Sequence, residues 1–428
     1  MNTISSQNPF FETYSTLHST VPFDKIKTGD YVPAIREGIR RQNAEIEAII
    51  RNPEVPTFAN TVLAYEKSGE MLHRVSTVFG NLLSAETDDD LQELAKEIMP
   101  MMSEHENNIS LNEELFARIK AVYEQQDKET LSPEQHKLLE DIYNGFVRNG
   151  ANLLGEDKEK YRALCKELSL LTLQFSENNL KETNDYKLVI TDKSQLAGLP
   201  ESAVEAAAET AGEKGVEGWV FTLQAPSYGP FLTYADSRDL RRELYMAYNT
   251  KCTHDNASNN LEIVKKLANV RMEIAQLLGY DNFAEYNLQE RMAQNSESVY
   301  KLLDQLLEAY TPTAKQEYAE VQALARQAEG EDFVLMPWDW AYYSHKLKDR
   351  KFNIDDELLR PYFELNNVKQ GVFGLATRLY GITFKKNPDI PVYHKDVDAY
   401  EVFDKDGNSL PCSIPTSTPE QASAREPG

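Results

Sequence analysis

The sequence predicts a mainly α-helical fold with one small mixed α/β element near residues 186–224. Apolar side chains recur every three or four residues through most of residues 1–180, which is the spacing of one face of an α-helix. Segments of strand-like composition follow at residues 186–191 and 218–224. The helical spacing returns from residue 237 onward, so long helices bound the mixed element on both sides.

The amino-terminal helices are predicted from apolar stripes and from residues that suit helix ends. In the first, after Pro33, the stripe consists of Ile35, Ile39, Ile46 and Ile49. A second long helix is expected from about Phe58 to Ser84. A third begins after Asp88 to Asp90, because acidic side chains favour the amino end of a helix. Further helices are expected at 112–126, at 133–150 with Ser132 as its cap, and at 156–182.

The rest of the chain is expected to be helical up to a strand-like carboxyl-terminal stretch. The mixed element has a short helix at 200–212 between its two strands, and "PSYGP" at 226–230 is interpreted as a turn. Helices are then expected at 237–249, 260–278, 282–291, 296–329, 339–350, 355–363 and 367–380. Residues 397–410 are strand-like again, with a tight turn at Asp406-Gly407.

Length and composition indicate a soluble protein of two or three domains. The 428 residues are 41% hydrophobic and 27% charged. A net charge of −24 argues against a nucleic-acid partner, because phosphate binding requires clustered basic residues. The compact basic run Lys346 to Lys351 precedes acidic residues and is interpreted as a solvated helix end.

The chain is expected to be cytoplasmic. Its first twenty residues do not have the pattern of a signal peptide, and no stretch is apolar for long enough to predict a membrane helix. The three cysteines, Cys165, Cys252 and Cys412, are odd in number and far apart. They indicate free thiols in a reducing compartment.

The histidines do not form the usual motif of a helical zinc hydrolase. That motif needs two histidines four residues apart on one helical face, with a glutamate beside the first. The seven histidines are His18, His73, His105, His136, His254, His345 and His394. None has a partner four residues away. His105 is followed by Glu106, but Ile109 occupies the position of the second histidine, so His105 is interpreted as a packed helix residue.

Other site chemistry is equally sparse. Cys165 lies near an apolar stripe and is expected in the core. Cys252 and His254 share a polar turn, which leaves a thiol–imidazole hydrolase as a remote alternative. "DKDGN" at 404–408 imitates the start of a calcium-binding loop, but Pro415 occupies the position of its last ligand, so the segment is interpreted as a turn. We therefore predict no catalytic, cofactor-binding or metal-binding residues from the motifs.

The segment Met336 to Phe384 carries a resemblance. Its aromatic residues Trp338, Trp340, Tyr342 and Tyr343 are expected to pack in a core, with Asp339 capping the helix behind them. The pattern W-D-x-x-Y-Y, then "LRPYF", then "VFGLATRLYGI" closely resembles the M3 family of zinc metallopeptidases, the thimet oligopeptidase and oligopeptidase A group. Residues 237–251, 267–293 and two amino-terminal stretches, "PFDKIKTGDYVPAIREGI" and "NPEVPTFANTV", resemble it too. Within this family, the sequence resembles the bacterial peptidyl-dipeptidases (Dcp) most closely.

This resemblance implies a fold and a domain division. It covers about residues 9–410 and implies a helical half-channel, with 1–225 as the amino-terminal helical region and 226–410 as the first part of the catalytic region. In the family, the strand of residues 400–410 is followed by a returning strand and then by the His-Glu-x-x-His helix, which has no counterpart here. Residues 411–428 contain four prolines and one large aliphatic residue, Ile414, and are interpreted as a non-family tail that a frameshift, splice or assembly error could produce.

The resemblance also implies a function for the family that this chain is not expected to perform alone. A full-length relative binds zinc and cleaves short peptides, as a peptidyl-dipeptidase or an endopeptidase. These 428 residues are expected to bind no zinc specifically and to lack peptidase activity. Short peptides are the expected partners, with no nucleic acid and no membrane, and the chain is expected to be a monomer. The alternative is a non-catalytic helical scaffold that binds peptides or a partner.

A first prediction concerns the coding DNA. If residues 411–428 arise from a change of reading frame, translation beyond the codon of Leu410 in all three frames should reveal a His-Glu-x-x-His helix. Sequencing the source DNA for several hundred bases checks this. Absence of the motif from every frame would contradict it.

Overall fold

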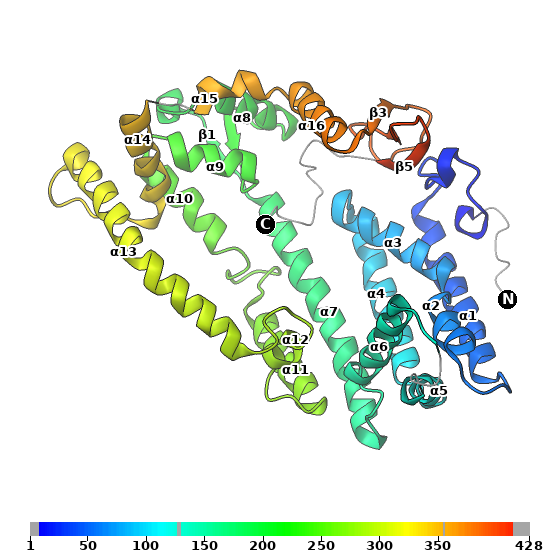
Figure 1. Cartoon of the computed structure of the whole chain (residues 1–428). Helices are drawn as coiled ribbons and strands as arrows, with labels where there is room; N and C mark the ends of the chain where they lie inside the picture. The colour runs from blue at the N-terminus through cyan, green and yellow to red at the C-terminus, as the bar shows by residue number, and fades with distance from the viewer. Residues whose placement is uncertain (1–7, 126–129, 354–355, 414–428) are drawn as a thin grey trace. The chain divides into compact units, whose positions relative to one another are not determined.

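The computed structural model describes residues 8–125, 130–353 and 356–413, and their fold is mainly α-helical, as predicted (Figure 1). The strands of these residues form one sheet of two strands and one of three. The described residues cluster into two compact units. Unit 1 comprises parts of 1–174, 266–283 and 369–428, and unit 2 comprises parts of 175–265 and 284–368. This clustering does not test the predicted division into 1–225, 226–410 and 411–428, which stays a prediction.

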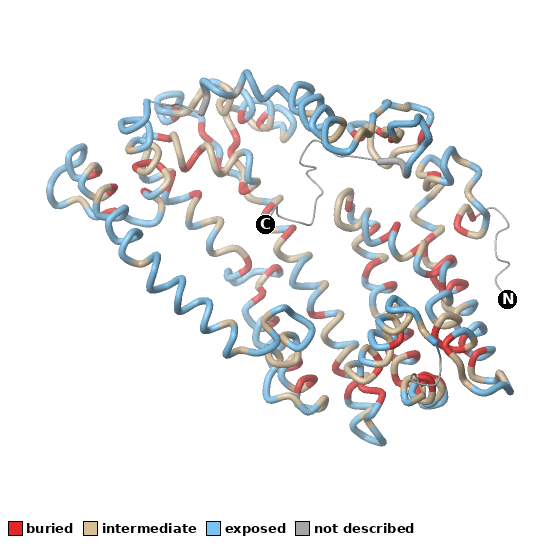
Figure 2. The backbone as a smooth tube through the Cα atoms, in the orientation of Figure 1, coloured by how far each residue is buried: buried red, intermediate tan, exposed pale blue. Residues whose placement is uncertain are grey.

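The core of unit 1 lies between three helices, α1 (Tyr31–Ile50), α3 (Glu70–Ala85) and α4 (Asp89–Ser110). The predicted stripe of α1 is confirmed, since Ile35, Ile46 and Ile49 are buried and Ile39 packs against the core. Buried residues follow these helices in Figure 2. The stripe therefore accounts for how α1 packs.

The helix predicted from Phe58 to Ser84 is broken into three segments. These are the π-helical turn η4 (Phe58–Val62), α2 (Leu63–Glu66) and α3. The break lies at Gly69, which has a φ of +75°, a left-handed conformation that glycine adopts without a steric cost. Its N–H donates to the Glu45 carboxylate of α1 at 2.7 Å. The prediction of one helix was wrong because this local turn interrupts an otherwise continuous apolar pattern.

The acidic run and the predicted cap Ser132 both lie at helix amino ends. Asp88 accepts a hydrogen bond from the N–H of Leu91 at 2.7 Å and so begins α4. Ser132 accepts one from the N–H of Gln135 at 3.2 Å, which begins α6 (Pro133–Arg148). The remaining helices of this region are α5 (Glu113–Glu124) and α7 (Gly155–Asp185).

The predicted mixed element is present in unit 2. Strand β1 (Leu188–Ile190) pairs antiparallel with β2 (Trp219–Phe221), and α8 (Glu201–Glu213) lies between them in sequence. The turn predicted at 226–230 is wrong, because these residues lie within helix α9 (Ala225–Tyr234). Pro226 lies in the first turn of α9, where the backbone N–H groups have no partner within the helix, so the missing N–H of proline costs no hydrogen bond. Phe231 of α9 packs edge-on against Phe221, with ring centroids 4.6 Å apart, so tertiary packing overrides the local turn signal.

The later helices follow the predicted order. They are α10 (Arg238–Asn249), α11 (Leu261–Leu277), α12 (Phe283–Leu288), α13 (Ser296–Glu329), α14 (Trp340–Phe352), α15 (Asp356–Leu359) and α16 (Leu365–Tyr380). The helix expected at 355–363 is present as α15 followed by the 3-10 turn η8 (Arg360–Phe363). Among the described residues, none of the helices combines the length and the apolar character that a membrane span requires.

The carboxyl-terminal strands form an antiparallel sheet in the order β3-β4-β5. Its members are β3 (Thr383–Lys386), which the sequence did not predict, β4 (Tyr400–Phe403) and β5 (Ser409–Ser413). The Asp404 carboxylate accepts hydrogen bonds from the N–H groups of Asp406 and Asn408, so 404–408 is a turn, as predicted. The returning strand continues through Ser413, and residues 414–428 lie outside the described residues.

The close approach of α1 to α3 predicts a contrast between two helical glycines. A Cβ on Gly38 would stand 2.9 Å from the Cα of Leu72, whereas one on Gly80 would meet nothing within 4 Å. Gly38→Ala should therefore lower the free energy of unfolding by about 1–3 kcal/mol through overpacking. Gly80→Ala should raise it by roughly 0.5–1 kcal/mol, because alanine favours the helix. Urea denaturation of both variants measures the contrast, and a stabilising Gly38→Ala would contradict it.

Candidate functional site

A buried ionic cluster in unit 2 joins α10 to the 3-10 turn η7 (Pro337–Asp339), which leads into α14. Asp339 is fully buried. Arg238 donates to both of its carboxylate oxygens, from Nε at 3.1 Å and from Nη2 at 2.7 Å. Arg241 donates from Nη2 to Oδ1 at 3.0 Å. Because the two arginines are three residues apart on α10, both reach the same carboxylate.

Asp339 does not cap α14 as predicted. Its side chain makes no capping hydrogen bond to that helix and instead accepts one from the N–H of Met336, three residues earlier, at 3.0 Å. This bond closes η7 before the helix begins. The prediction was wrong because the carboxylate oxygens of Asp339 accept from two guanidinium groups and from the N–H of Met336. Hydrogen bonds from charged donors are stronger than those from the N–H groups of a helix end.

The guanidinium of Arg241 is enclosed by protein groups. It donates to the carbonyl oxygens of Ala235 at 2.7 Å, Asp236 at 3.2 Å and Trp338 at 3.3 Å, besides its bond to Asp339. It also lies over the ring of Tyr342, 4.0 Å from the ring centroid. Buried charges persist when they are paired and hydrogen-bonded in this way.

The two tyrosines of the W-D-x-x-Y-Y segment are buried, as predicted. Tyr342 donates its hydroxyl to Asp236 at 2.6 Å, and Tyr343 donates its hydroxyl to Glu329 of α13 at 2.7 Å. Burial, together with these carboxylate acceptors, raises the pKa of both phenols well above its usual range. Both therefore stay protonated hydrogen-bond donors at neutral pH.

The tryptophans differ from this pattern. Trp340 is 41% exposed and stacks on Tyr318 of α13, so core packing was the wrong prediction for it. Trp338 is half-buried beside Tyr245 and Arg242. In this segment, Tyr342 and Tyr343 therefore lie in the core, whereas Trp340 lies at the surface.

The cluster is suited to anchoring helices and not to acid–base chemistry. Both arginines are hydrogen-bonded to the fully buried carboxylate of Asp339, and the raised pKa of each tyrosine keeps its proton in place. Together these contacts fix α10, α13 and α14 relative to one another within unit 2. The role of Arg238 and Arg241 was not predicted from the sequence, although two arginines three residues apart on one helix face were a visible signal.

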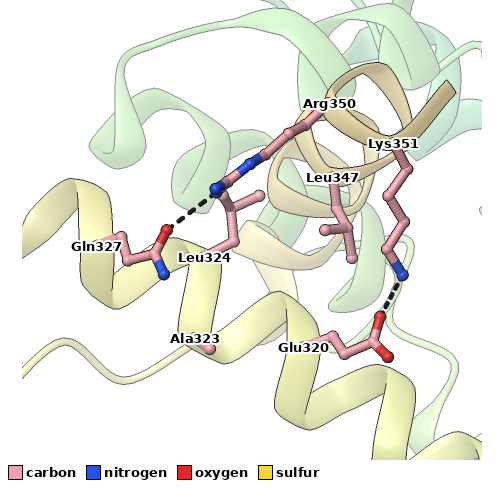
Figure 3. Close-up of a pocket in the computed structure, with 7 residues that line it drawn as sticks. All are labelled: Glu320, Ala323, Leu324, Gln327, Leu347, Arg350 and Lys351. Carbon is pink, nitrogen blue, oxygen red and sulfur yellow. Dashed lines mark hydrogen bonds and ion pairs between the residues drawn. The ribbon is translucent and has the colours of Figure 1, made fainter. Parts of the chain in front are cut away.

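A pocket of about 440 Å³ lies between α13 and α14 (Figure 3). It is lined by Glu320, Ala323, Leu324, Gln327, Leu347, Arg350 and Lys351. Its charged groups already have partners, since Arg350 donates to Gln327 at 3.0 Å and Lys351 pairs with Glu320. The basic run Lys346 to Lys351 lies in the last turns of α14 with exposed charges, so the prediction of a solvated helix end is confirmed.

The histidine and cysteine candidates are not assembled into a site. His105 is buried on α4, its Nε2 lies 2.7 Å from Gln42 Oε1, and burial lowers its pKa, which confirms the packed-residue interpretation. Cys165 is half-buried on α7, and burial raises the pKa of its thiol.

The turn that contains Cys252 and His254 is organised around Glu182 of α7. The N–H of Cys252 donates to the Glu182 carboxylate, and His254 Nδ1 lies 3.5 Å from the same carboxylate. Burial and then the charge of Glu182 raise the pKa of the Cys252 thiol to about 11. A nucleophilic cysteine needs a lowered pKa, so this arrangement does not favour the thiol–imidazole hydrolase.

A zinc centre does not fit the part of the chain that the structure describes. Among those residues, no three or more His, Cys, Asp or Glu side chains are grouped closely enough to hold a metal ion. The whole sequence, moreover, lacks two histidines at the spacing of the zinc helix. We therefore derive no catalytic step through a metal.

The region that contains the W-D-x-x-Y-Y segment is similar to known proteins. The family model "Peptidase family M3" matches residues 231–411. The chain is 38% identical to the dipeptidyl carboxypeptidase of Escherichia coli over 95% of its own length. Residues 231–411 belong to peptidase family M3.

Other M3 relatives match over similar lengths. The dipeptidyl carboxypeptidase of Salmonella typhimurium is 36% identical over 94% of the chain, and oligopeptidase A of Escherichia coli is 33% identical over 90%. The chain covers 60%, 59% and 57% of these three M3 relatives, so it spans about three fifths of their length. The expected resemblance is thereby confirmed, near the dipeptidyl carboxypeptidases and oligopeptidase A.

The buried cluster predicts unequal effects of the same substitution at two aspartates. Asp339→Asn leaves Arg241 as a buried charge without its anion and should lower the free energy of unfolding by about 3–5 kcal/mol. Asp236→Asn is the control, because Asp236 is exposed and asparagine still accepts from Tyr342. Its effect should stay within about 1 kcal/mol. Equal effects in denaturant titrations would rule out the anchoring role of Asp339.

Proposed function

We propose that this chain is the scaffold portion of an M3 metallopeptidase that acts on short peptides and releases dipeptides from their carboxyl end. The observation that supports it best is the 38% identity to a dipeptidyl carboxypeptidase over 95% of the chain. The identity to oligopeptidase A is lower, at 33%, which favours dipeptide release over internal cleavage. The proposal places the protein in the cytoplasm as a monomer, without nucleic-acid or membrane partners.

The proposal assigns the chain a supporting role in the reaction. Zinc is the cofactor that the family implies, and the histidines of these 428 residues do not supply the ligands for it. What the chain contributes is a rigid arrangement of helices, since the cluster around Asp339 fixes α10, α13 and α14. Peptide hydrolysis would require residues beyond those present in this chain.

A second candidate is a helical scaffold that binds peptides or a protein partner without catalysis. The exposed apolar side chains of α13 and α16 favour it, since such surfaces mark interaction sites. Titration calorimetry with a short peptide separates the two. Micromolar peptide binding by the pure chain would support the non-catalytic scaffold.

The activity of the pure chain is the direct test. Incubated with zinc and a blocked short peptide, it should release no dipeptide above background, because the metal and the general base are each worth several orders of magnitude in rate. The Escherichia coli dipeptidyl carboxypeptidase serves as the positive control under the same conditions, with and without a chelator. Chelator-sensitive dipeptide release by the pure chain, at an enzyme-like turnover, would contradict the prediction.

A further inference from the structure

Three buried polar atoms in unit 1 have no hydrogen-bond partner among the residues that the structure describes. They are the hydroxyl oxygens of Tyr14 and Tyr31 and the Nε of Arg74. Tyr31 is the first residue of α1 and is 2% exposed, and Arg74 lies in α3, which packs beside α1 (Figure 1). Buried polar groups are almost always hydrogen-bonded, so three unpartnered groups in one region indicate a bound water molecule or ion.

The three groups are neighbours around the buried side chain of Phe10. The guanidinium carbon of Arg74 lies 4.9 Å from the ring centroid of Tyr14. The Nη2 of Arg74 donates to the carbonyl oxygen of Phe10 at 3.1 Å, and the ring of Tyr31 packs against that of Phe10 with centroids 5.4 Å apart. Burial, and then the proximity of Asp30 and of the Tyr14 phenol, raise the pKa of Tyr31 to about 12. The two hydroxyls and the guanidinium therefore belong to one local environment.

The charge of Arg74 has no counter-ion in the described part of the chain. The contacts of its guanidinium there are the bond to the carbonyl oxygen of Phe10 and the ring of Tyr14. The carboxylate of Asp30 accepts instead from the N–H of Lys27 at 2.8 Å. A guanidinium that is partly removed from water is stabilised when an anion balances its charge.

The chemistry of the three groups favours an anion over a water molecule. The Nε of Arg74 can only donate a hydrogen bond, and burial raises the pKa of both phenols, so all three groups can donate to one acceptor at neutral pH. A water molecule has two lone pairs and would leave the charge of Arg74 unbalanced. The rings of Phe10 and Phe79 adjoin Tyr31, with centroids at 5.4 and 5.3 Å. Because removing an ion from water is costly, these apolar surroundings favour a small, weakly hydrated ion.

We propose that Tyr14, Tyr31 and Arg74 bind one small monovalent anion of the halide class, such as chloride. The anion accepts hydrogen bonds from both hydroxyls and from the Nε of Arg74, and it balances the guanidinium charge. It thereby ties the segment that follows the 3-10 turn η1 (Pro9–Phe11) to α1 and α3, two of the helices that enclose the core of unit 1. The site is independent of the proposed peptidase function, and its ligand acts on the stability of unit 1.

Thermal unfolding of the 428-residue chain tests the proposal. Unfolding is measured in sodium chloride and in sodium gluconate at equal ionic strength, because gluconate is too large for such a site. Chloride should raise the midpoint of at least one unfolding transition by about 2–4 °C, since a ligand that binds only the folded state stabilises it. Sodium bromide should act as sodium chloride does.

Single hydroxyl deletions locate the effect of chloride. Tyr31→Phe removes one donor and should reduce the chloride-dependent rise to half or less. Tyr14→Phe, at a less buried position, is a second variant with the same expected result. The matched control is Tyr186→Phe, which also removes a buried hydroxyl without a partner among the described residues. Burial and then the charge of Glu243 raise the pKa of Tyr186 to about 12, so no anion is expected there and the control should keep the full rise.

Anomalous diffraction from crystals of the chain soaked in sodium bromide gives the position of the ion. A bromide peak should lie within hydrogen-bonding distance of the Nε of Arg74 and of the Tyr31 hydroxyl. The lack of a peak there, the lack of a chloride-dependent rise, or an equal rise in Tyr31→Phe, Tyr14→Phe and Tyr186→Phe would each overturn the proposal. A loss of stability in Tyr31→Phe that is the same in chloride and in gluconate would overturn it in favour of a buried water molecule.

Discussion

The carboxylate of Asp339 imposes the strongest constraint on unit 2. A fully buried anion is stable only when cations and N–H groups surround it, and here two arginines and the N–H of Met336 do so. Arg241 lies 98 residues earlier in the chain. The fold must therefore bring α10 against η7, and the tyrosines that follow in α14 then reach Asp236 and Glu329. Replacing such a cluster with apolar residues can leave stability unchanged, so its contribution lies in fixing one arrangement of helices.

Local sequence patterns predicted much of this fold. They failed where a contact with a residue distant in the sequence determines the secondary structure. The stripe of Ile35, Ile46 and Ile49 was sufficient for α1 because one buried face sets the helical period. The break at Gly69 was missed because the apolar pattern continues through it, and the N–H that marks the break binds a side chain from another helix. Residues 226–230 look like a turn by composition, yet burial of Phe231 against β2 makes them helical.

In the candidate site, too, features set by nearby residues could be predicted from the sequence, whereas contacts between distant residues could not. Histidine spacing is a local property, so the sequence alone was enough to argue against a zinc helix in this chain. The partners of Asp339 are not local. Neither Arg238 nor Arg241 could be assigned to that carboxylate from one sequence, because an aspartate before a helix is more often a cap. The environment of Cys252 and His254 is also set by a distant residue, since the carboxylate of Glu182 on α7 contacts both of them.

Helix α13 shows how the apolar surface of this chain is distributed. Toward its carboxyl end, Val321 and Ala325 are buried in the core that includes Tyr342 and Tyr343 of α14. The same face continues toward the amino end through Tyr300, Leu303, Leu307 and Tyr310, each at least half exposed. A helix in water gains little from such side chains, and most helical stability in proteins comes from packing an apolar face. Among the described residues, this stripe is therefore buried near the carboxyl end of α13 and exposed near its amino end, so packing stabilises only one part of the helix.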